Sequence, residues 1–117
     1  MQKVTIWHNP RCSKSRETLA LLQERHIEPE IVEYLKDTPS QAEIERTLKR
    51  LGIEARGLMR DNEDAYKASH ADDPSLSQKK LIELMHAHPV LIQRPVVIVG
   101  EQARIGRPPE AVLEILP

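Results

Sequence analysis

The order of segments in the first thirty-five residues limits the fold of this chain more than any other feature. Residues 4–7 are β-branched, apolar or aromatic and predict a short, largely buried strand. Pro10 then marks a turn, because proline disfavours helix at the residue before it. Residues 13–26 have helical spacing, and residues 30–35 are a second strand candidate. The chain therefore begins with a β-α-β unit.

The middle of the chain has helical patterns and no strand pattern. The segment SQAE at 40–43 is a capping box that opens a helix, and Gly52 follows its last apolar position. Residues 54–75 are polar and predict a region of short helix and loop. Ser77 opens a further helix, which stops before Pro89.

The C-terminal part returns to a strand pattern. Residues 95–100 predict a buried strand, and residues 103–105 return as the second arm of a hairpin. Two prolines at 108–109 open a terminal helix. The expected fold is α/β, with a central four-stranded mixed sheet in the order β-α-β, helical insert, β-β-α, flanked by helices. We expect one domain over 1–117, with the insert at about 38–90.

Composition excludes several classes of protein. A chain of 117 residues with 39% hydrophobic and 30% charged residues is typical of one globular domain. The formal net charge of -1 gives no basic field for nucleic acid, and the apolar runs are too short to cross a membrane. Residues 1–10 do not resemble a secretory signal. A single cysteine fits a reducing compartment, so we expect a cytoplasmic protein.

That cysteine, Cys12, falls where the first loop meets a helix N-terminus. Arg11, Lys14 and Arg16 are its neighbours in sequence, and His8 begins the same loop. The unpaired amides and partial positive charge of a helix N-terminus favour a thiolate, and nearby cations act in the same direction. We therefore expect a thiol pKa below the ordinary value of about 8.5 and a reactive group. The polar surroundings argue against a buried, inert cysteine.

Ser15 stands where a second cysteine would complete a C-x-x-C motif. Serine cannot form a disulfide, so an oxidised Cys12 must be resolved by a thiol from another molecule. This excludes an ordinary dithiol oxidoreductase. Cys12 and Arg16 form C-x3-R, which is too tight for the C-x5-R loop with which tyrosine-phosphatase-type enzymes wrap a phosphate.

Four blocks of the sequence resemble the glutaredoxin-coupled arsenate reductases, a family of thioredoxin-like fold. The chain is closest to the short chromosomal branch of that family, and the likeness covers essentially its whole length. The blocks are WHNPRCSKSR at 7–16, LMR at 58–60, HPVLIQRPVV at 88–97 and RIGRPPEAVLEIL at 104–116.

The resemblance implies roles for particular residues. Cys12 matches the cysteine that attacks arsenate, and His8 matches the histidine that helps to lower the thiol pKa. Three arginines match those that bind the oxyanion and stabilise the intermediates: Arg60, Arg94 and Arg107. Their guanidinium groups suit that role, because they bind tetrahedral oxyanions in bidentate geometry.

Three further assignments accompany these roles. Ser15 and Arg16 are assigned to the substrate-binding loop. The resemblance also implies a cis peptide bond at Arg94-Pro95, where a cis-proline faces the cysteine in thioredoxin-like folds.

The expected function is glutathione- and glutaredoxin-dependent reduction of arsenate to arsenite, as in arsenic detoxification. Glutathione is the expected co-substrate and glutaredoxin the expected protein partner. We expect no bound cofactor, no metal site, no nucleic-acid partner and no membrane association. Two alternatives remain. One is a stress regulator of the same fold that binds RNA polymerase, although Ser15 removes its C-x-x-C switch. The other is a general thiol-redox protein that acts on glutathionylated partners.

Overall fold

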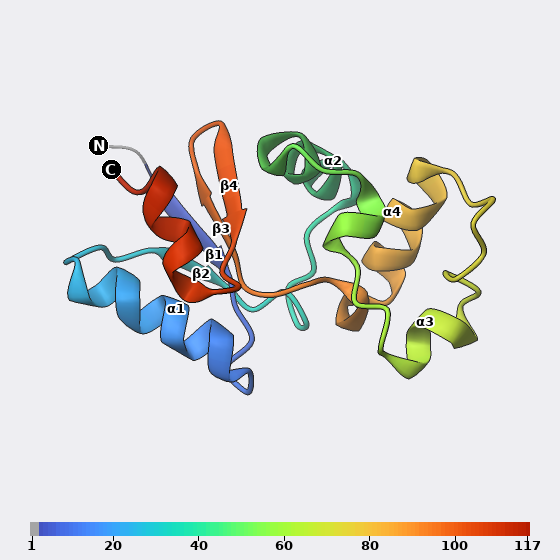
Figure 1. The fold of residues 1–117 in the computed structure, drawn as a ribbon, viewed down its shortest axis with the longest axis horizontal. Coiled ribbons are helices and arrows are strands. Elements are labelled where there is room, and N and C mark those ends of the chain that lie inside the picture. Colours follow the sequence, from blue (N-terminus) through green and yellow to red (C-terminus); the bar gives the residue numbers. More distant parts are fainter. Residues whose placement is uncertain (1–2) are drawn as a thin grey trace. The chain divides into compact units, whose positions relative to one another are not determined.

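A computed structural model describes residues 3–117, and the chain divides into two compact units (Figure 1). The first unit combines the residues up to Asp37 with Arg94–Pro117, and the second is Thr38–Gln93. The second unit spans the segment that the sequence predicts as a helical insert. Of the N-terminal segment examined for a secretory signal, Met1 and Gln2 lie outside the described residues.

A four-stranded mixed sheet forms the centre of the first unit (Figure 1). Its strands are β1 (Val4–Trp7), β2 (Glu30–Val32), β3 (Val96–Val99) and β4 (Gln102–Ile105), in the order β2-β1-β3-β4. The β1–β2 pair is parallel, and the β1–β3 and β3–β4 pairs are antiparallel. This confirms the predicted mixed sheet and the C-terminal hairpin.

The second strand is shorter than predicted. It ends at Val32 instead of continuing to residue 35, because the chain turns at Glu33, whose carbonyl accepts hydrogen bonds from the Lys36 and Asp37 amides at 2.9 and 2.8 Å. The carbonyl of Val32 instead accepts the amide of His8 at 2.8 Å. This bond ties the end of β2 to the start of the loop that carries Cys12.

Two helical segments supply the apolar residues that cover one face of the sheet. These are α1 (Ser13–Glu24) and η3 (Pro109–Ile115), and η3 packs against both α1 and β4. Alternate residues of β1 and β3 point into the shared core, as a pleated strand requires. The buried cluster consists of Val4, Ile6, Leu22, Val97, Val99, Val112 and Ile115.

The C-terminal helix forms where it was predicted, but it is a 3-10 helix. Its first turn is closed by the Ala111 amide on the Pro108 carbonyl at 3.0 Å, an i to i+3 bond of the tighter kind. Prolines at 108 and 109 occupy the N-cap and the first helical position, where the missing N–H costs no helical hydrogen bond.

Helices make up most of the second unit. They are α2 (Gln41–Leu51), η1 (Ala55–Leu58), α3 (Asp64–Ala68), α4 (Gln78–Ala87) and η2 (Pro89–Leu91). Ser77 caps α4 through the Lys80 amide, as predicted.

The predicted capping box at the start of α2 forms only in half. Ser40 Oγ accepts the Glu43 amide at 3.1 Å, which confirms the cap. The Glu43 carboxylate does not return to the Ser40 amide, because it pairs with Arg46 and Arg50. The side-chain hydrogen bond from Arg46 is the main reason that the pKa of Glu43 lies below its usual value.

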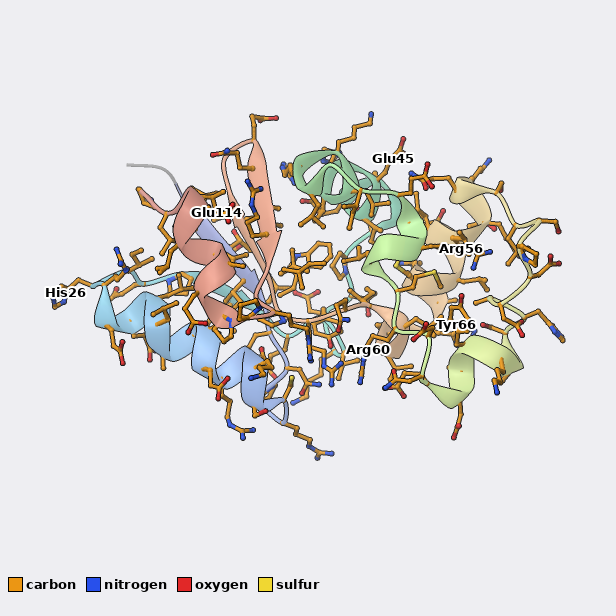
Figure 2. All side chains as sticks on the ribbon, in the orientation of Figure 1. His26, Glu45, Arg56, Arg60, Tyr66 and Glu114 are labelled. Atoms are coloured by element: carbon orange, nitrogen blue, oxygen red, sulfur yellow. The ribbon has the colours of Figure 1, made fainter. Side chains whose placement is uncertain are left out.

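Arg56 holds together the polar loops between η1 and α4. Its Nη1 donates to the Tyr66 hydroxyl at 3.0 Å and to the Ala71 carbonyl at 2.8 Å, and Figure 2 labels Arg56 and Tyr66. A guanidinium group with several fixed donors can bind several loop carbonyls at once. The short helices and loops predicted for residues 54–75 are confirmed.

Two peptide bonds before proline are cis. Arg94-Pro95 is cis, as predicted, and Arg107-Pro108 is also cis, which the sequence did not indicate.

None of the helices within residues 3–117 is long and apolar enough to cross a lipid bilayer.

The C-terminal cap of α2 gives a test of the second unit. Gly52 has φ 71°, and a Cβ there would meet nothing within 4 Å. We expect Gly52→Ala to lower the free energy of unfolding by about 1 kcal/mol, because alanine is strained in left-handed backbone. Gly52→Asn should lose less, since asparagine tolerates this conformation. Urea denaturation measures both, and an unchanged Gly52→Ala protein would contradict the assigned cap.

Candidate functional site

Cys12 occupies the N-cap position of α1, with φ -95° and ψ 124°. Its amide donates to the Asn9 carbonyl at 3.0 Å, and its carbonyl accepts the Arg16 amide at 3.0 Å. The predicted position at the junction of loop and helix is confirmed. The expectation of an exposed thiol is wrong: only 7% of Cys12 is exposed, because the turn closed at Asn9 carries it inward.

The pKa of Cys12 is nevertheless below its ordinary value, as the sequence predicts. Burial is the largest single influence and acts to raise it. The amides of Ser15 and Lys14 and the charges of Arg94 and Arg107 act in the opposite direction and outweigh burial. The Cys12 side chain accepts no regular N-cap hydrogen bond. The amides at the helix N-terminus still point towards the sulfur and favour its negative charge.

The cations that lower the thiol pKa are not the ones expected from the sequence. Arg11 is exposed, and Lys14 forms an ion pair with Glu17 at 3.5 Å. Arg16 donates to the Pro10 carbonyl at 3.0 Å. Residues next to an N-cap in sequence diverge around the helix and do not face the cap side chain. The charge near the sulfur comes from distant parts of the chain.

Arg107 makes the direct contact with the thiol. Its Nη2 lies 3.6 Å from Cys12 Sγ, and its Nε donates to the Arg94 carbonyl at 2.8 Å. One guanidinium group therefore joins the start of α1 to the segment that enters β3. Arg94 is half-buried, and its charge also favours the thiolate.

His8 and Ser15 support the Cys12 loop from within the first unit. His8 is 6% exposed, and its Nδ1 lies 2.5 Å from Ser15 Oγ. Burial is the main reason that the pKa of His8 lies below its ordinary value, so the ring is neutral at pH 7. Ser15 Oγ also accepts the Asn9 amide at 3.0 Å. His8 supplies no charge to the thiol; it reaches Cys12 through Ser15, whose amide favours the thiolate.

The two residues assigned to the substrate-binding loop therefore have different surroundings. Ser15 is fully buried and its hydroxyl is bound to His8 and Asn9, so only its amide is directed at the sulfur. Arg16 is exposed and binds a backbone carbonyl of its own loop. Asn9, just before the turn predicted at Pro10, is a further support of the loop that the sequence did not indicate. Its Oδ1 accepts the Arg11 amide at 3.0 Å.

Arg60 belongs to the second unit, where Figure 2 labels it. Its Nη1 forms an ion pair with Glu63 Oε1 at 2.5 Å, and its amide donates to the Leu91 carbonyl at 2.7 Å. Of the three predicted arginines, the structure brings Arg94 and Arg107 to Cys12. The role of Arg60 in the same site stays a prediction.

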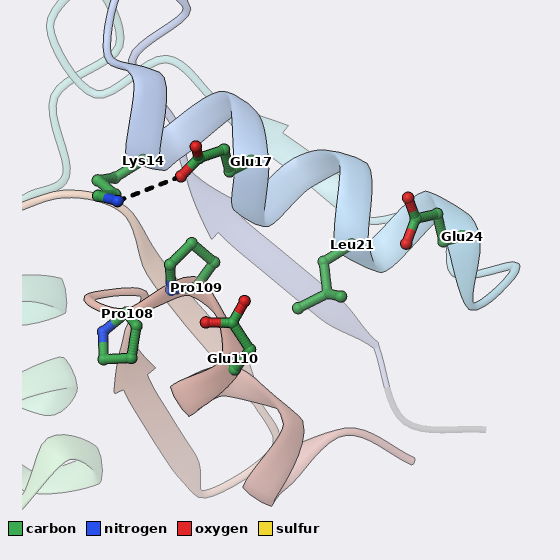
Figure 3. A pocket seen from close by; sticks show the side chains of 7 residues that line it. All are labelled: Lys14, Glu17, Leu21, Glu24, Pro108, Pro109 and Glu110. Atoms are coloured by element: carbon green, nitrogen blue, oxygen red, sulfur yellow. Dashed lines mark ion pairs between the residues drawn. The ribbon is translucent and has the colours of Figure 1, made fainter.

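A cleft of about 330 Å³ lies between α1 and η3 in the first unit. Figure 3 shows the Lys14–Glu17 ion pair at one end and Glu110 facing the helix, beside Pro108 and Pro109. Neither Cys12 nor Arg107 lines this cleft.

The arrangement provides a nucleophile and a binding group for an anion. A thiolate attacks electrophilic centres, and a planar guanidinium group binds tetrahedral oxyanions with two parallel hydrogen bonds. Within residues 3–117 no three His, Cys, Asp or Glu side chains are grouped as ligands for a metal ion. The first unit therefore places a thiol of lowered pKa beside two arginines at the N-terminus of a helix.

Comparison with known proteins places this site in a family. The model of the ArsC family matches residues 7–115. An arsenate reductase of Haemophilus influenzae is 50% identical over 97% of this chain and 98% of its own length. An Escherichia coli protein named only uncharacterized protein YfgD is 53% identical over 98% of both chains.

Solved structures agree with the sequence relatives. The structure of an arsenate reductase from Vibrio cholerae matches with a TM-score of 0.96 and 50% identity, over 98% of each chain. The molecule is a thioredoxin-like protein with a cysteine at the start of its first helix. The chain belongs to the ArsC family.

The ionisation of Cys12 can be measured directly. We expect the pH midpoint of its alkylation by iodoacetamide to lie below about 8.5, because the lowered pKa increases the thiolate fraction at neutral pH. Arg94→Ala and Arg107→Ala should each raise the midpoint. Arg11→Ala is the matched control and should leave it unchanged, since Arg94 and Arg107, and not Arg11, are the charges that lower the Cys12 pKa. Equal midpoints in all four proteins would refute the assigned electrostatics.

Proposed function

We propose that this protein is an arsenate reductase that uses glutathione and glutaredoxin, acting in the cytoplasm. The observation that carries the proposal is the contact of Arg107 with Cys12 Sγ, at 3.6 Å, beside a thiol whose pKa is lowered. The family membership and the relatives named arsenate reductase support arsenate as the oxyanion.

The first step forms a bond between sulfur and arsenic. The Cys12 thiolate attacks arsenic, the new S–As bond forms, and one As–O bond breaks so that water leaves after protonation. Arsenic remains As(V) in this adduct. Arg107 is placed to bind an oxyanion next to the sulfur, and Arg94 adds positive charge to the same place.

The second step transfers the electrons. A glutathione thiolate attacks the Cys12 sulfur, and the electron pair of the S–As bond passes to arsenic, which becomes As(III) and leaves as arsenite. Cys12 is then joined to glutathione in a mixed disulfide. Two thiols have supplied two electrons, so the balance needs no metal or organic cofactor.

The third step needs a partner thiol. Cys12 is the single cysteine of the chain, and Ser15 stands where a dithiol enzyme would have its second. A glutaredoxin thiolate attacks the glutathione sulfur, takes the glutathionyl group and releases the Cys12 thiolate. The low pKa of Cys12 supports this step, because a thiol of low pKa is a good leaving group.

A general thiol-redox role on glutathionylated partners is the second candidate. The lowered thiol pKa supports this role as well as it supports arsenate reduction, because both reactions begin with an activated sulfur. The two roles differ in the need for the arginines. Arsenate reduction requires guanidinium groups to bind the anion, whereas thiol exchange requires only an activated sulfur.

Steady-state turnover separates the candidates. We expect arsenate reduction in the presence of glutathione and glutaredoxin, abolished by Cys12→Ser. Arg94→Ala and Arg107→Ala should lower kcat/KM for arsenate about a hundred- to thousand-fold, the usual loss for a contact that stabilises a transition state. Arg107→Lys should recover only part of the kcat/KM that Arg107→Ala loses, because lysine keeps the positive charge but lacks the planar guanidinium group. Arg60→Ala tests the remaining arginine in the same assay.

The control is deglutathionylation of a glutathionylated peptide by the same proteins. Arg11→Ala should retain both activities. No arsenate turnover by the wild-type protein, together with rapid deglutathionylation, would favour the second candidate. Arsenate turnover that is unchanged in the Arg94 and Arg107 alanine variants would refute the oxyanion site.

A further inference from the structure

Gly106 lies where three parts of the first unit meet. Its amide donates to the Pro95 carbonyl at 2.9 Å, and the next amide, that of Arg107, donates to the Ile105 carbonyl at 2.9 Å. The backbone is therefore fixed on both sides of the glycine. Arg107, the residue that contacts Cys12 Sγ, comes directly after Gly106 in the chain.

There is no room for a side chain at Gly106. A Cβ there would lie 2.6 Å from Thr18 Oγ1, 2.8 Å from Pro95 Cγ and 3.2 Å from Thr18 Cγ2. The first two distances are below any that real Cβ atoms show, so an added methyl group must displace a neighbour. Gly106 is not among the glycines with positive φ, which are Gly52 and Gly100. The position requires glycine for space and not for backbone conformation.

Neither neighbour can move aside easily. Thr18 is fully buried, and its hydroxyl donates to the Lys14 carbonyl at 2.8 Å, one turn along the helix that Cys12 caps. Pro95 is buried and precedes β3. The segment that carries Arg107 is the part exposed to solvent, so the displacement falls on it.

We propose that Gly106 is a positioning residue: its missing side chain lets the segment that carries Arg107 lie directly against α1, at the distance from which the guanidinium group reaches the Cys12 sulfur. Arg107 is a long side chain with considerable rotamer freedom. Its contacts with the Arg94 carbonyl and with Cys12 Sγ both depend on where its backbone is held. Moving that backbone away from α1 lengthens the 3.6 Å contact with sulfur, because the sulfur is held at the start of that helix.

The test is a double-mutant cycle on Cys12 ionisation, which needs no arsenate and is independent of the proposed function. We expect Gly106→Ala to raise the pH midpoint of Cys12 alkylation by about 0.5 unit or more, a loss of about threefold in thiolate at neutral pH. In the Arg107→Ala background the same change should add nothing further, because the contact it disturbs is already gone. Gly57→Ala is the control for replacing a glycine and should leave the midpoint unchanged.

Two results would overturn the proposal. One is a folded Gly106→Ala protein, judged by circular dichroism, with the wild-type midpoint. The other is an equal rise with and without Arg107, which would show that the change acts through the helix and not through the guanidinium group.

A compensating change replaces the cycle if Gly106→Ala alone does not fold. Thr18 supplies two of the atoms that a Cβ at residue 106 would meet, Oγ1 at 2.6 Å and Cγ2 at 3.2 Å, and Thr18→Ala removes both. We expect the double variant Gly106→Ala/Thr18→Ala to have a higher Cys12 midpoint than Thr18→Ala alone, because Pro95 Cγ would still lie 2.8 Å from the added Cβ. Equal midpoints in these two proteins would overturn the proposal.

Discussion

The contact between Arg107 Nη2 and Cys12 Sγ joins residues 95 positions apart in the chain, and the features of the first unit converge on it. A buried thiolate is unfavourable unless charges and donors compensate its lost hydration. Here burial raises the pKa of Cys12, and two helix amides and two guanidinium groups outweigh it. Removing the positive charge of Arg94 or Arg107 would raise the pKa of the buried thiol.

The sheet makes that contact geometrically feasible. The β1–β3 pairing is antiparallel and places Trp7 opposite Val96. The loop after β1 and the segment before β3 therefore lie at the same end of the strands. The β3–β4 hairpin then returns the chain to that end of the strands, where Ile105 lies opposite Val96. Cys12, Arg94 and Arg107 therefore come from three segments that the sheet register brings to one end of the strands.

Much of this fold is encoded locally and could be predicted. The strand β3, the N-caps at Ser40 and Ser77 and the turn at Gly52 depend on near neighbours in sequence, and they formed as expected. The reactive cysteine was recognisable for the same reason, since a helix N-terminus is a local feature. The resemblance added Arg94 and Arg107, which no local pattern distinguishes from surface arginines.

What could not be predicted depends on contacts that the hydrophobic pattern does not specify. Arg11, Lys14 and Arg16 are close to Cys12 in sequence, yet Lys14 pairs with Glu17 and Arg16 binds the Pro10 carbonyl. Glu43 leaves its capping box because Arg46 and Arg50 bind it. The glycine required at residue 106 follows from contacts with Thr18 and Pro95, which belong to other segments of the chain.

The central claim is that Cys12 and its arginines form one oxyanion site. The most direct measurement is the rate of Cys12 alkylation at fixed pH as arsenate or sulfate is added. We predict that either anion protects the wild-type thiol competitively, that salt weakens the protection, and that Arg94→Ala and Arg107→Ala lose it. Protection that is absent from the wild-type protein, or unchanged in both variants, would contradict the claim.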